Sequence, residues 1–568
     1  MSLIRPLRSL TALAVLLSTA LPLAADSSAG SYLAARQADY ASDYRAVVEY
    51  GTRTLAQDPE NVDIMEGLLI AYLGLGDFDT ALPVARRMVQ LMPDSQVAGL
   101  VLLADAVKRE DWARVQELQA GGTSVGGLMD DMIAVWSQFG VGQVDKAFDA
   151  FEALGDEPGT GGMARYHQAM AYAMAGDHEN AARLFSGDEG RLQMDRTGII
   201  AYAQVLSQLE RSPDAVEMLD KVAPNTTDPT LVTMRAELSA GKPQVFDALT
   251  SPREAIAQVV FKVADTLAAE ADPTVVLLYA RLAEFLDSDT VGATLLSARL
   301  LESMERYELA VAAYDSVPPD HSAYPQAALG QSDALRRMGR VDEAIGELRA
   351  LTKAYPELAA IHVALGDALR FEDRFAEAIP AYDAAIALYE APVASQWVVY
   401  FARAICLERE KNWPAAEADF RYALELSPDQ PNVLNYLGYS FVEMQTNLDE
   451  ALGMIERAVA GRPNDGYITD SLGWVYYRLG RYDEAVDQME RAVELMPVDP
   501  VVNDHLGDTY WAVGRHREAE FQWSRALSFI TDDSDLDEVK PDRIRRKLEV
   551  GLDVVLDEEG AEPLHAVE

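Results

Sequence analysis

Residues 470–500 read DSLGWVYYRLGRYDEAVDQMERAVELMPVDP. Apolar side chains recur in the first half every three or four residues, at Leu472, Tyr476 and Leu479. This spacing predicts an amphipathic helix, which Gly480 and Arg481 interrupt. Two acids then open a second helix, where the macrodipole favours negative charge, and Pro497 prevents its continuation. The stretch therefore predicts a helix–turn–helix unit.

The same unit recurs along the chain at a spacing of about 34 residues. Alanines follow this period at Ala310, Ala344, Ala378, Ala416, Ala451, Ala485 and Ala519. Prolines keep a similar spacing, as in the step from Pro463 to Pro497. We expect Gly473 and Ala485 at the closest approach of two antiparallel helices, where a larger side chain would separate them. A fixed period of this length is typical of a solenoid.

The motifs LGYSF at 437–441, LGWVY at 472–476 and LGDTY at 506–510 resemble the tetratricopeptide repeat (TPR) family, as does EADFRYALELSP at 417–428. The resemblance implies an all-α, TPR-type α-solenoid, a right-handed superhelix of helix–turn–helix repeats. No strand pattern is present in the sequence, which agrees with an all-α fold.

The positions where the repeat pattern weakens suggest where the parts of the chain begin and end. We expect a signal peptide at 1–25 and an N-terminal TPR block at 31–120. A degenerate TPR-like helical region with Gly- and Pro-rich loops follows at 121–250, and a helical pair at 251–290. The C-terminal TPR array covers 291–530, and 531–568 holds an acidic linker, a capping helix predicted over 542–556, and a tail. Solenoids need such a cap to cover their last apolar face.

The N-terminus has the features of a secretory signal. Arg5 and Arg8 precede a short apolar run that ends at Leu21, and small residues lead to Ala25. The run is too short to span a bilayer, which predicts cleavage near Ala25 rather than an uncleaved anchor. No cysteine follows the run, so we expect no lipid attachment there. This pattern predicts export to the periplasm of a Gram-negative bacterium, at most peripheral to the envelope membranes.

Composition excludes several classes of function. The 568 residues contain 92 acidic and 48 basic side chains, a formal net charge of −44. Such a polyanion is repelled by nucleic acid. The single cysteine excludes an intramolecular disulfide and cysteine-rich metal frameworks.

No catalytic motif is present. None of the seven histidines forms a metalloprotease pair, and we interpret His505 beside Asp504 as a solvated or groove-lining histidine. Asp533, Asp535 and Asp537 imitate a calcium loop but lack its glycine and its final acid. Cys406 lies among apolar residues and is expected to be a small core residue. We therefore predict a non-enzymatic protein without cofactor or metal.

In TPR solenoids the first helix of each repeat lines the concave face. The family resemblance assigns partner contacts to the second, fifth, ninth and twelfth positions of the repeat. In the last three repeats these positions give Asn432, Asn435, Tyr439, Tyr467, Asp470, Trp474, Tyr477, Asp504, Asp508 and Trp511. Each aromatic has an alternative role as core between adjacent helices. Together they predict a groove for an extended or helical peptide, and its acids favour a neutral or cationic partner.

A closer resemblance covers about the last 280 residues. The run from LGY at 437 to EAEFQW at 523 is similar to proteobacterial envelope TPR proteins, some of them outer-membrane lipoproteins. These bind a carboxy-terminal processing protease and bring it cell-wall hydrolases to degrade. This chain lacks the lipoprotein cysteine.

These observations predict a periplasmic protein–protein interaction adaptor, binding peptide or protein partners that include a processing protease and its substrates. The alternatives are a scaffold for envelope assembly, secretion or polysaccharide export, and a general periplasmic holdase. The three differ in what they hold: a protease with its clients, a membrane complex, or unrelated unfolded chains.

Overall fold

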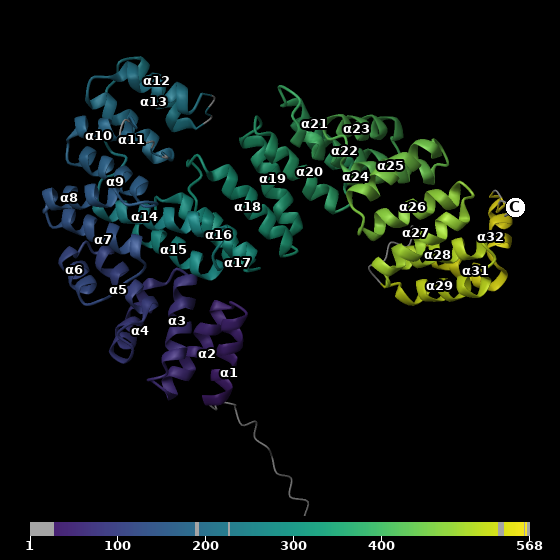
Figure 1. Ribbon diagram of the computed structural model, residues 1–568, viewed down its shortest axis with the longest axis horizontal. Coiled ribbons are helices and arrows are strands. Elements are labelled where there is room, and N and C mark those ends of the chain that lie inside the picture. The colour runs from purple at the N-terminus through teal and green to yellow at the C-terminus, as the bar shows by residue number, and fades with distance from the viewer. Residues whose placement is uncertain are drawn as a thin grey trace, which may run out of the picture. The chain divides into compact units, whose positions relative to one another are not determined.

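The computed structural model describes residues 28–187, 192, 194–224, 226, 228–531, 539–561 and 563–564 (Figure 1). The predicted signal peptide at 1–25 and most of the acidic linker lie outside these residues. The chain divides into two compact units, Met1–Ala344 and Ile345–Glu568, here called the N-terminal and C-terminal units. The described residues are all helical or irregular, without a strand, so the prediction of an all-α solenoid is confirmed.

The N-terminal unit consists of helix pairs along most of its length. Its helices are α1 (Ser28–Tyr40), α2 (Tyr44–Gln57), α3 (Val62–Gly74), α4 (Phe78–Leu91), α5 (Gln96–Lys108), α6 (Trp112–Ala120), α7 (Gly127–Gly140), α8 (Val144–Gly155), α9 (Gly161–Met174), α10 (His178–Phe185), α11 (Arg196–Gln208), α12 (Ser212–Val222), α13 (Pro229–Ser239), α14 (Pro252–Leu267), α15 (Pro273–Leu286), α16 (Val291–Ser303), α17 (Tyr307–Asp315) and α18 (Tyr324–Arg337).

The boundary between the units falls within α19 (Val341–Ala354). The C-terminal unit continues with α20 (Ala359–Phe371), α21 (Phe375–Ala387), the short 3-10 helix η1 (Ala394–Gln396), α22 (Trp397–Arg409), α23 (Trp413–Leu426), α24 (Pro431–Glu443), α25 (Leu448–Gly461), α26 (Gly466–Arg478), α27 (Tyr482–Leu495), α28 (Pro500–Ala512), α29 (His516–Phe529), α31 (Pro541–Val550) and α32 (Leu552–Glu559).

One backbone feature marks the turn between the two helices of a repeat. A residue with positive φ occupies this turn in thirteen pairs, at Ser42, Gly76, Glu110, Gly142, Gly176, Glu210, Glu305, Gly339, Asp373, Lys411, Gln445, Gly480 and Gly514. Successive positions are mostly 34 residues apart. The turn therefore continues through residues 121–224, where the sequence pattern itself is weak.

Short-range contacts explain why each unit folds as it does. The side chains of Asp43, Asp77 and Asp111 accept hydrogen bonds from backbone N–H groups at the starts of α2, α4 and α6, which satisfies donors that the helix leaves unpaired. A methyl group on Gly473 would lie 2.8 Å from Cγ of Met489, and Ala485 is fully buried. The predicted close approach in this repeat is confirmed.

In the N-terminal unit, the pair α14–α15 returns to the repeats at the start of the chain. Helix α15 packs on α3 and α5, and α14 packs on α7 (Figure 1). The ring of Phe285 stacks on Phe78 with centroids 4.2 Å apart, and Leu282 lies in the same core. The helices α3, α5 and α7 are first helices of their repeats, so the chain itself covers this face of the N-terminal unit.

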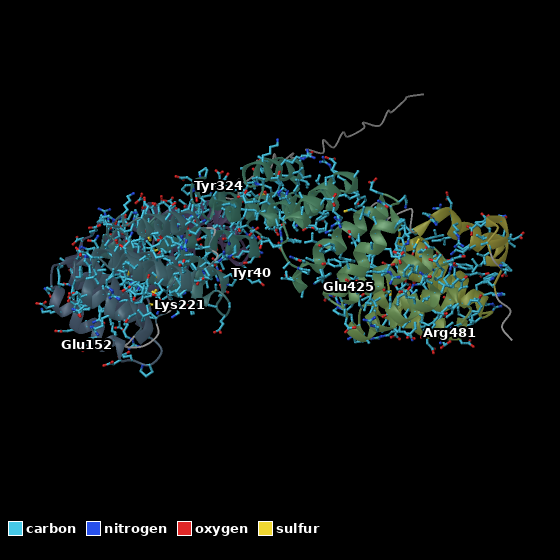
Figure 2. The ribbon with its side chains drawn as sticks, turned by 90° about the horizontal axis from the view of Figure 1, so that it is seen from above. Tyr40, Glu152, Lys221, Tyr324, Glu425 and Arg481 are labelled. Atoms are coloured by element: carbon cyan, nitrogen blue, oxygen red, sulfur yellow. The ribbon has the colours of Figure 1, made fainter. Side chains whose placement is uncertain are left out.

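The C-terminal unit ends differently. The sequence predicts one capping helix over 542–556, whereas the chain forms α31 and α32 on either side of Gly551, whose φ is +87°. Helix α31 packs on α29. Polar side chains such as Glu425 and Arg481 are exposed on this unit (Figure 2).

Candidate functional site

The first helices α22, α24, α26 and α28 of the C-terminal unit form one surface, which we call the first-helix face. Two cavities open on it, of about 730 and 560 Å³, here called the large and the small cavity. Both are lined by Tyr439, Glu443 and Val539. A surface hollowed over several successive repeats suits an elongated ligand.

The large cavity holds four of the predicted partner-binding residues, namely Asn435, Tyr439, Tyr467 and Asp470. Tyr467 is 60% exposed, and its hydroxyl lies 3.4 Å from Asp499. The Oδ1 atom of Asn435 is buried without a hydrogen-bond partner. Asn432 is exposed and accepts a hydrogen bond of 3.0 Å from Arg462, but it does not line either cavity.

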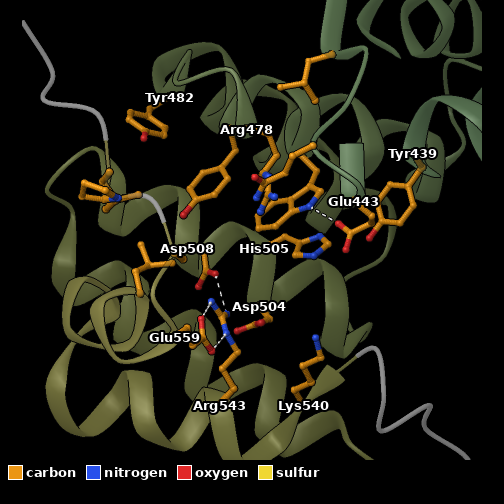
Figure 3. Close-up of a pocket in the computed structure, with 18 of the residues that line it drawn as sticks. Tyr439, Glu443, Arg478, Tyr482, Asp504, His505, Asp508, Lys540, Arg543 and Glu559 are labelled. Carbon is orange, nitrogen blue, oxygen red and sulfur yellow. Dashed lines mark hydrogen bonds and ion pairs between the residues drawn. The ribbon is translucent and has the colours of Figure 1, made fainter. Parts of the chain in front are cut away.

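An aromatic stack forms one wall of the small cavity (Figure 3). The Trp474 ring lies between Tyr477, at 4.7 Å, and His505, at 4.0 Å between centroids. Its indole Nε1 donates to Glu443 at 2.9 Å. Trp474 and Tyr477 are each 8% exposed, so both belong to the core while one edge faces the cavity.

Within this stack, the buried His505 pairs with Asp470. Its Nδ1 lies 3.0 Å from the Asp470 carboxylate. Burial lowers the pKa of His505, but the nearby charge of Asp470 and the hydrogen bond outweigh burial and raise that pKa to about 9. His505 is therefore protonated at neutral pH, and we interpret its contact with Asp470 as a structural ion pair.

Asp504 and Asp508 also line the small cavity, but the chain's own C-terminal helix engages both. Nζ of Lys547, which is 1% exposed, lies 2.6 Å from an oxygen of each carboxylate. Arg543 reaches Asp508 at 3.4 Å and Glu559 at 2.9 Å (Figure 3). Burial raises the pKa of Asp504, while Lys547 opposes that rise.

Trp511 lies away from both cavities, beneath the junction of α31 and α32. Its Nε1 donates to Asp553 at 2.9 Å. A methyl group on Gly551 would lie 2.5 Å from the Trp511 ring, so the backbone of the junction rests directly on the indole. Position twelve of this repeat thus contacts the chain itself.

The sequence analysis missed the part that the C-terminal segment plays at this face. Val539, Lys540, Arg543, Leu556 and Glu559 all line the small cavity. One signal was available: basic residues on α31 lie opposite the acids that the repeat positions place on α28. Arg478 at the end of α26 was also missed, because its position is outside the four considered.

Cys406 is a core residue, as the sequence predicts. Cys406 is fully buried, and burial raises the pKa of its thiol to about 12. Asp533, Asp535 and Asp537 lie outside the described residues. Among the residues that the structure describes, no cluster of three or more His, Cys, Asp or Glu side chains is arranged to hold a metal ion. Within the same residues, no helix is both long and apolar enough to cross a bilayer.

Family comparison identifies the repeats. A model described as tetratricopeptide repeat matches residues 32–95, 295–359, 329–392 and 363–431. Two further tetratricopeptide-repeat models match residues 470–497 and 162–185.

Two curated proteins resemble part of the chain. The TPR repeat-containing protein PA4667 of Pseudomonas aeruginosa is 30% identical over 184 residues, which are 32% of this chain and 30% of that protein. The bacteriophage adsorption protein A of Escherichia coli is 36% identical over 80 residues, 14% of this chain and 8% of that protein. The chain thus spans less than a third of the length of either relative.

Two solved structures align with this chain at low identity. Cut9–Hcn1 of the APC/C hetero-tetramer aligns with 93% of this chain and 96% of its own, at 14% identity and a TM-score of 0.38. YrrB, described as a TPR protein with an unusual peptide-binding site, aligns with 33% of this chain and 93% of its own, at 20% identity and a TM-score of 0.27.

Proposed function

Because the chain is a tetratricopeptide-repeat protein, and therefore a protein–protein interaction scaffold, we propose that its partners bind the first-helix face of the C-terminal unit. One observation carries this proposal: the large and small cavities open on that face. In the N-terminal unit, the corresponding helices α3, α5 and α7 pack against α14 and α15.

The large cavity supplies the groups that an extended peptide needs. Asn435 lines this cavity, and the Nδ2 group of its amide can donate to a C=O group of a peptide main chain. Tyr439 and Tyr467 offer aromatic surface with a polar end, the combination that is enriched at binding hot spots. Asp470 lines the same cavity, and its carboxylate is held by His505 at 3.0 Å. A partly aromatic groove of this kind favours a segment in extended or helical form.

The partner and the compartment form the second part of the proposal. The pattern at residues 1–25 supports export to the periplasm. The C-terminal repeats resemble envelope TPR adaptors that bind a carboxy-terminal processing protease. We therefore propose a periplasmic adaptor that couples such a protease to cell-wall hydrolases.

The test is crosslinking in intact cells, followed by pull-down of the mature protein and mass spectrometry. Recovery of a processing protease together with cell-wall hydrolases is the expected result. Recovery of a secretion or polymer-export complex would replace the adaptor with an assembly scaffold. A mixture of unrelated unfolded proteins would identify a holdase instead.

A matched pair of variants then tests the face itself. Tyr467→Ala should weaken binding of the recovered partner at least fivefold, since hot-spot truncations cost more than about 1 kcal/mol. Tyr40→Ala, at an 89% exposed tyrosine of the N-terminal unit, should leave binding unchanged. Equal losses in both variants, or in neither, would place the partner elsewhere.

A further inference from the structure

We propose that α32 is an internal ligand of the first-helix face, and that a partner displaces it with an acidic amphipathic helix of the same pattern. This inference rests on the proposed function and names the partner class for the small cavity. It concerns residues 552–559, which follow the anchored helix α31.

The position of α32 is the first argument. Leu556 and Glu559 line the small cavity together with Trp474 and Tyr477 of α26. The helix thus lies where the first helices of two repeats present their side chains. A helix in this position covers part of the first-helix face that a partner would use.

The contacts of α32 form a ligand-like pattern. Leu552 and Val555 are buried, and Leu556 packs partly buried against the same core. Its acids meet donors on the neighbouring elements: Asp553 accepts from Trp511, Glu558 from Arg546 at 2.6 Å, and Glu559 from Arg543. Leu552, Val555 and Leu556, at positions i, i+3 and i+4, form one apolar face of α32. The remaining positions of the helix are mainly acidic.

The attachment of α32 is weaker than that of α31. Helix α31 holds Lys547, which is buried between two carboxylates. The ion pairs of α32 instead use Glu558 and Glu559, whose side chains are 45% and 42% exposed, and such pairs contribute little. An eight-residue helix is also marginal by its own propensity. Release of α32 therefore leaves α31 in place.

The charge of the small cavity selects an acidic partner. Asp504 and Asp508 are matched by Lys547 and Arg543, as shown above. Arg478 and Lys540 line the same cavity, and among the described residues neither has an ion-pair partner. Glu443 on the same wall is already engaged by the Trp474 indole. For this end of the face we therefore favour an acidic partner over the neutral or cationic one that the sequence suggests, because Asp504 and Asp508 are paired within the chain.

The experiment adds a fluorescent peptide with the sequence of residues 551–561, GLDVVLDEEGA, to the full-length protein and follows its anisotropy. Val555→Asp places a charge on the buried face of α32 and should unseat it. Val554→Asp is the matched control, because Val554 is 42% exposed and next in sequence. We expect the Val555→Asp protein to bind the peptide at least tenfold more tightly than the wild type or the control.

Two further measurements keep the proposal falsifiable. A peptide with its acids changed to amides should bind more weakly, and so should the unchanged peptide when the protein also carries Arg546→Gln, because Arg546 donates to Glu558. In the wild type, amide hydrogens of α32 should exchange faster than those of α31. Equal peptide binding by all variants, or equal protection of α31 and α32, would show that α32 is a fixed part of the cap.

Failure here is distinguishable from failure of the proposed function. If the pull-down recovers partners and the peptide does not bind, only the internal ligand is excluded. If the peptide binds and no partner is recovered, the adaptor role is excluded instead.

Discussion

In the N-terminal unit, α14 and α15 press apolar side chains onto the first helices of the early repeats. In the C-terminal unit, α31 reaches the first helix α28 with the charged side chains of Lys547 and Arg543, and two cavities remain open. The same repeat is therefore covered in two ways. Apolar packing turns a potential groove into core, whereas a cap held by ion pairs leaves usable surface beside it.

The composition of the covering helices explains the difference. Ile256, Val260, Leu278 and Leu282 are buried on α14 and α15, and apolar burial of this kind excludes water completely. Helix α31 instead carries Arg543, Arg545, Arg546 and Lys547, which need polar partners. Charged groups must meet oppositely charged groups when they are buried, so Lys547 and Arg543 contact α28 where that helix has acids.

The largest effect is expected for Lys547. Lys547→Met leaves Asp504 and Asp508 facing each other without their buried cation, and we expect a loss of about 3–5 kcal/mol in the free energy of unfolding. Urea denaturation followed by tryptophan fluorescence measures it. Lys540→Met, at an exposed lysine of the same segment, should change stability by less than about 0.5 kcal/mol. Equal effects of both substitutions would refute the ion-paired cap.

In the N-terminal unit, Leu282→Ala should cost about 2–5 kcal/mol, because it opens a cavity between α15 and the first helices. Hydrogen exchange should show α3 and α5 losing protection together with α15. Val275→Ala, at a 43% exposed position of the same helix, is the control. Unchanged protection of α3 would mean that α15 does not complete this core.

The two units should respond oppositely to pH through one buried histidine each. Burial lowers the pKa of His167 to about 3, whereas Asp470 raises that of His505 to about 9. Below pH 6.5 His167 binds a proton in the unfolded chain but stays neutral in the folded one. The free energy of unfolding of the N-terminal unit should therefore fall by about 2 kcal/mol by pH 5. Between pH 6.5 and 9 His505 releases its proton in the unfolded chain but keeps it in the folded one. The free energy of unfolding of the C-terminal unit should therefore fall by about 2–3 kcal/mol by pH 9.

Unfolding at pH 5, 7 and 9, with hydrogen exchange reporting on α9 and α28 separately, measures both trends. His167→Gln should remove the loss of stability of the N-terminal unit at acid pH. Asp470→Asn should reduce the loss of stability of the C-terminal unit at alkaline pH. Parallel pH profiles in the two units would contradict the assignment.

The smallest effects concern the turn that both units share. Gly480→Ala should destabilise the C-terminal unit by about 1 kcal/mol, because a φ of +72° disfavours any residue with a Cβ atom. Glu305→Gly, at a φ of +59° in the N-terminal unit, should be neutral or stabilising by up to about 1 kcal/mol. Thermal melts resolve both. A stabilising Gly480→Ala, or a destabilising Glu305→Gly, would show that the turn is not equivalent in the two units.

Much of the repeat architecture could be predicted from the sequence. The spacing around Leu472, Gly473 and Ala485 predicts two packed helices, since residues three and four apart share a helix face and the turn lies only a few residues away. The all-α class follows from the same local pattern. In residues 121–224 the side-chain pattern weakens, yet the turn persists at Glu210, a residue type that gives no turn signal. Backbone geometry there depends on packing against neighbouring repeats.

The candidate site was predictable only in part. The repeat positions include Tyr439, Tyr467, Asp470 and Trp474, which line the two cavities in the structure, and their role in partner binding stays a prediction. The neighbours of Asp504 and Trp511 could not be read from spacing, because Lys547 and Asp553 lie about 40 residues further along the chain. Local periodicity determines which helices form and which faces are apolar. Which distant segment covers each face depends on complementary shape and charge, and these exist only once the chain has folded.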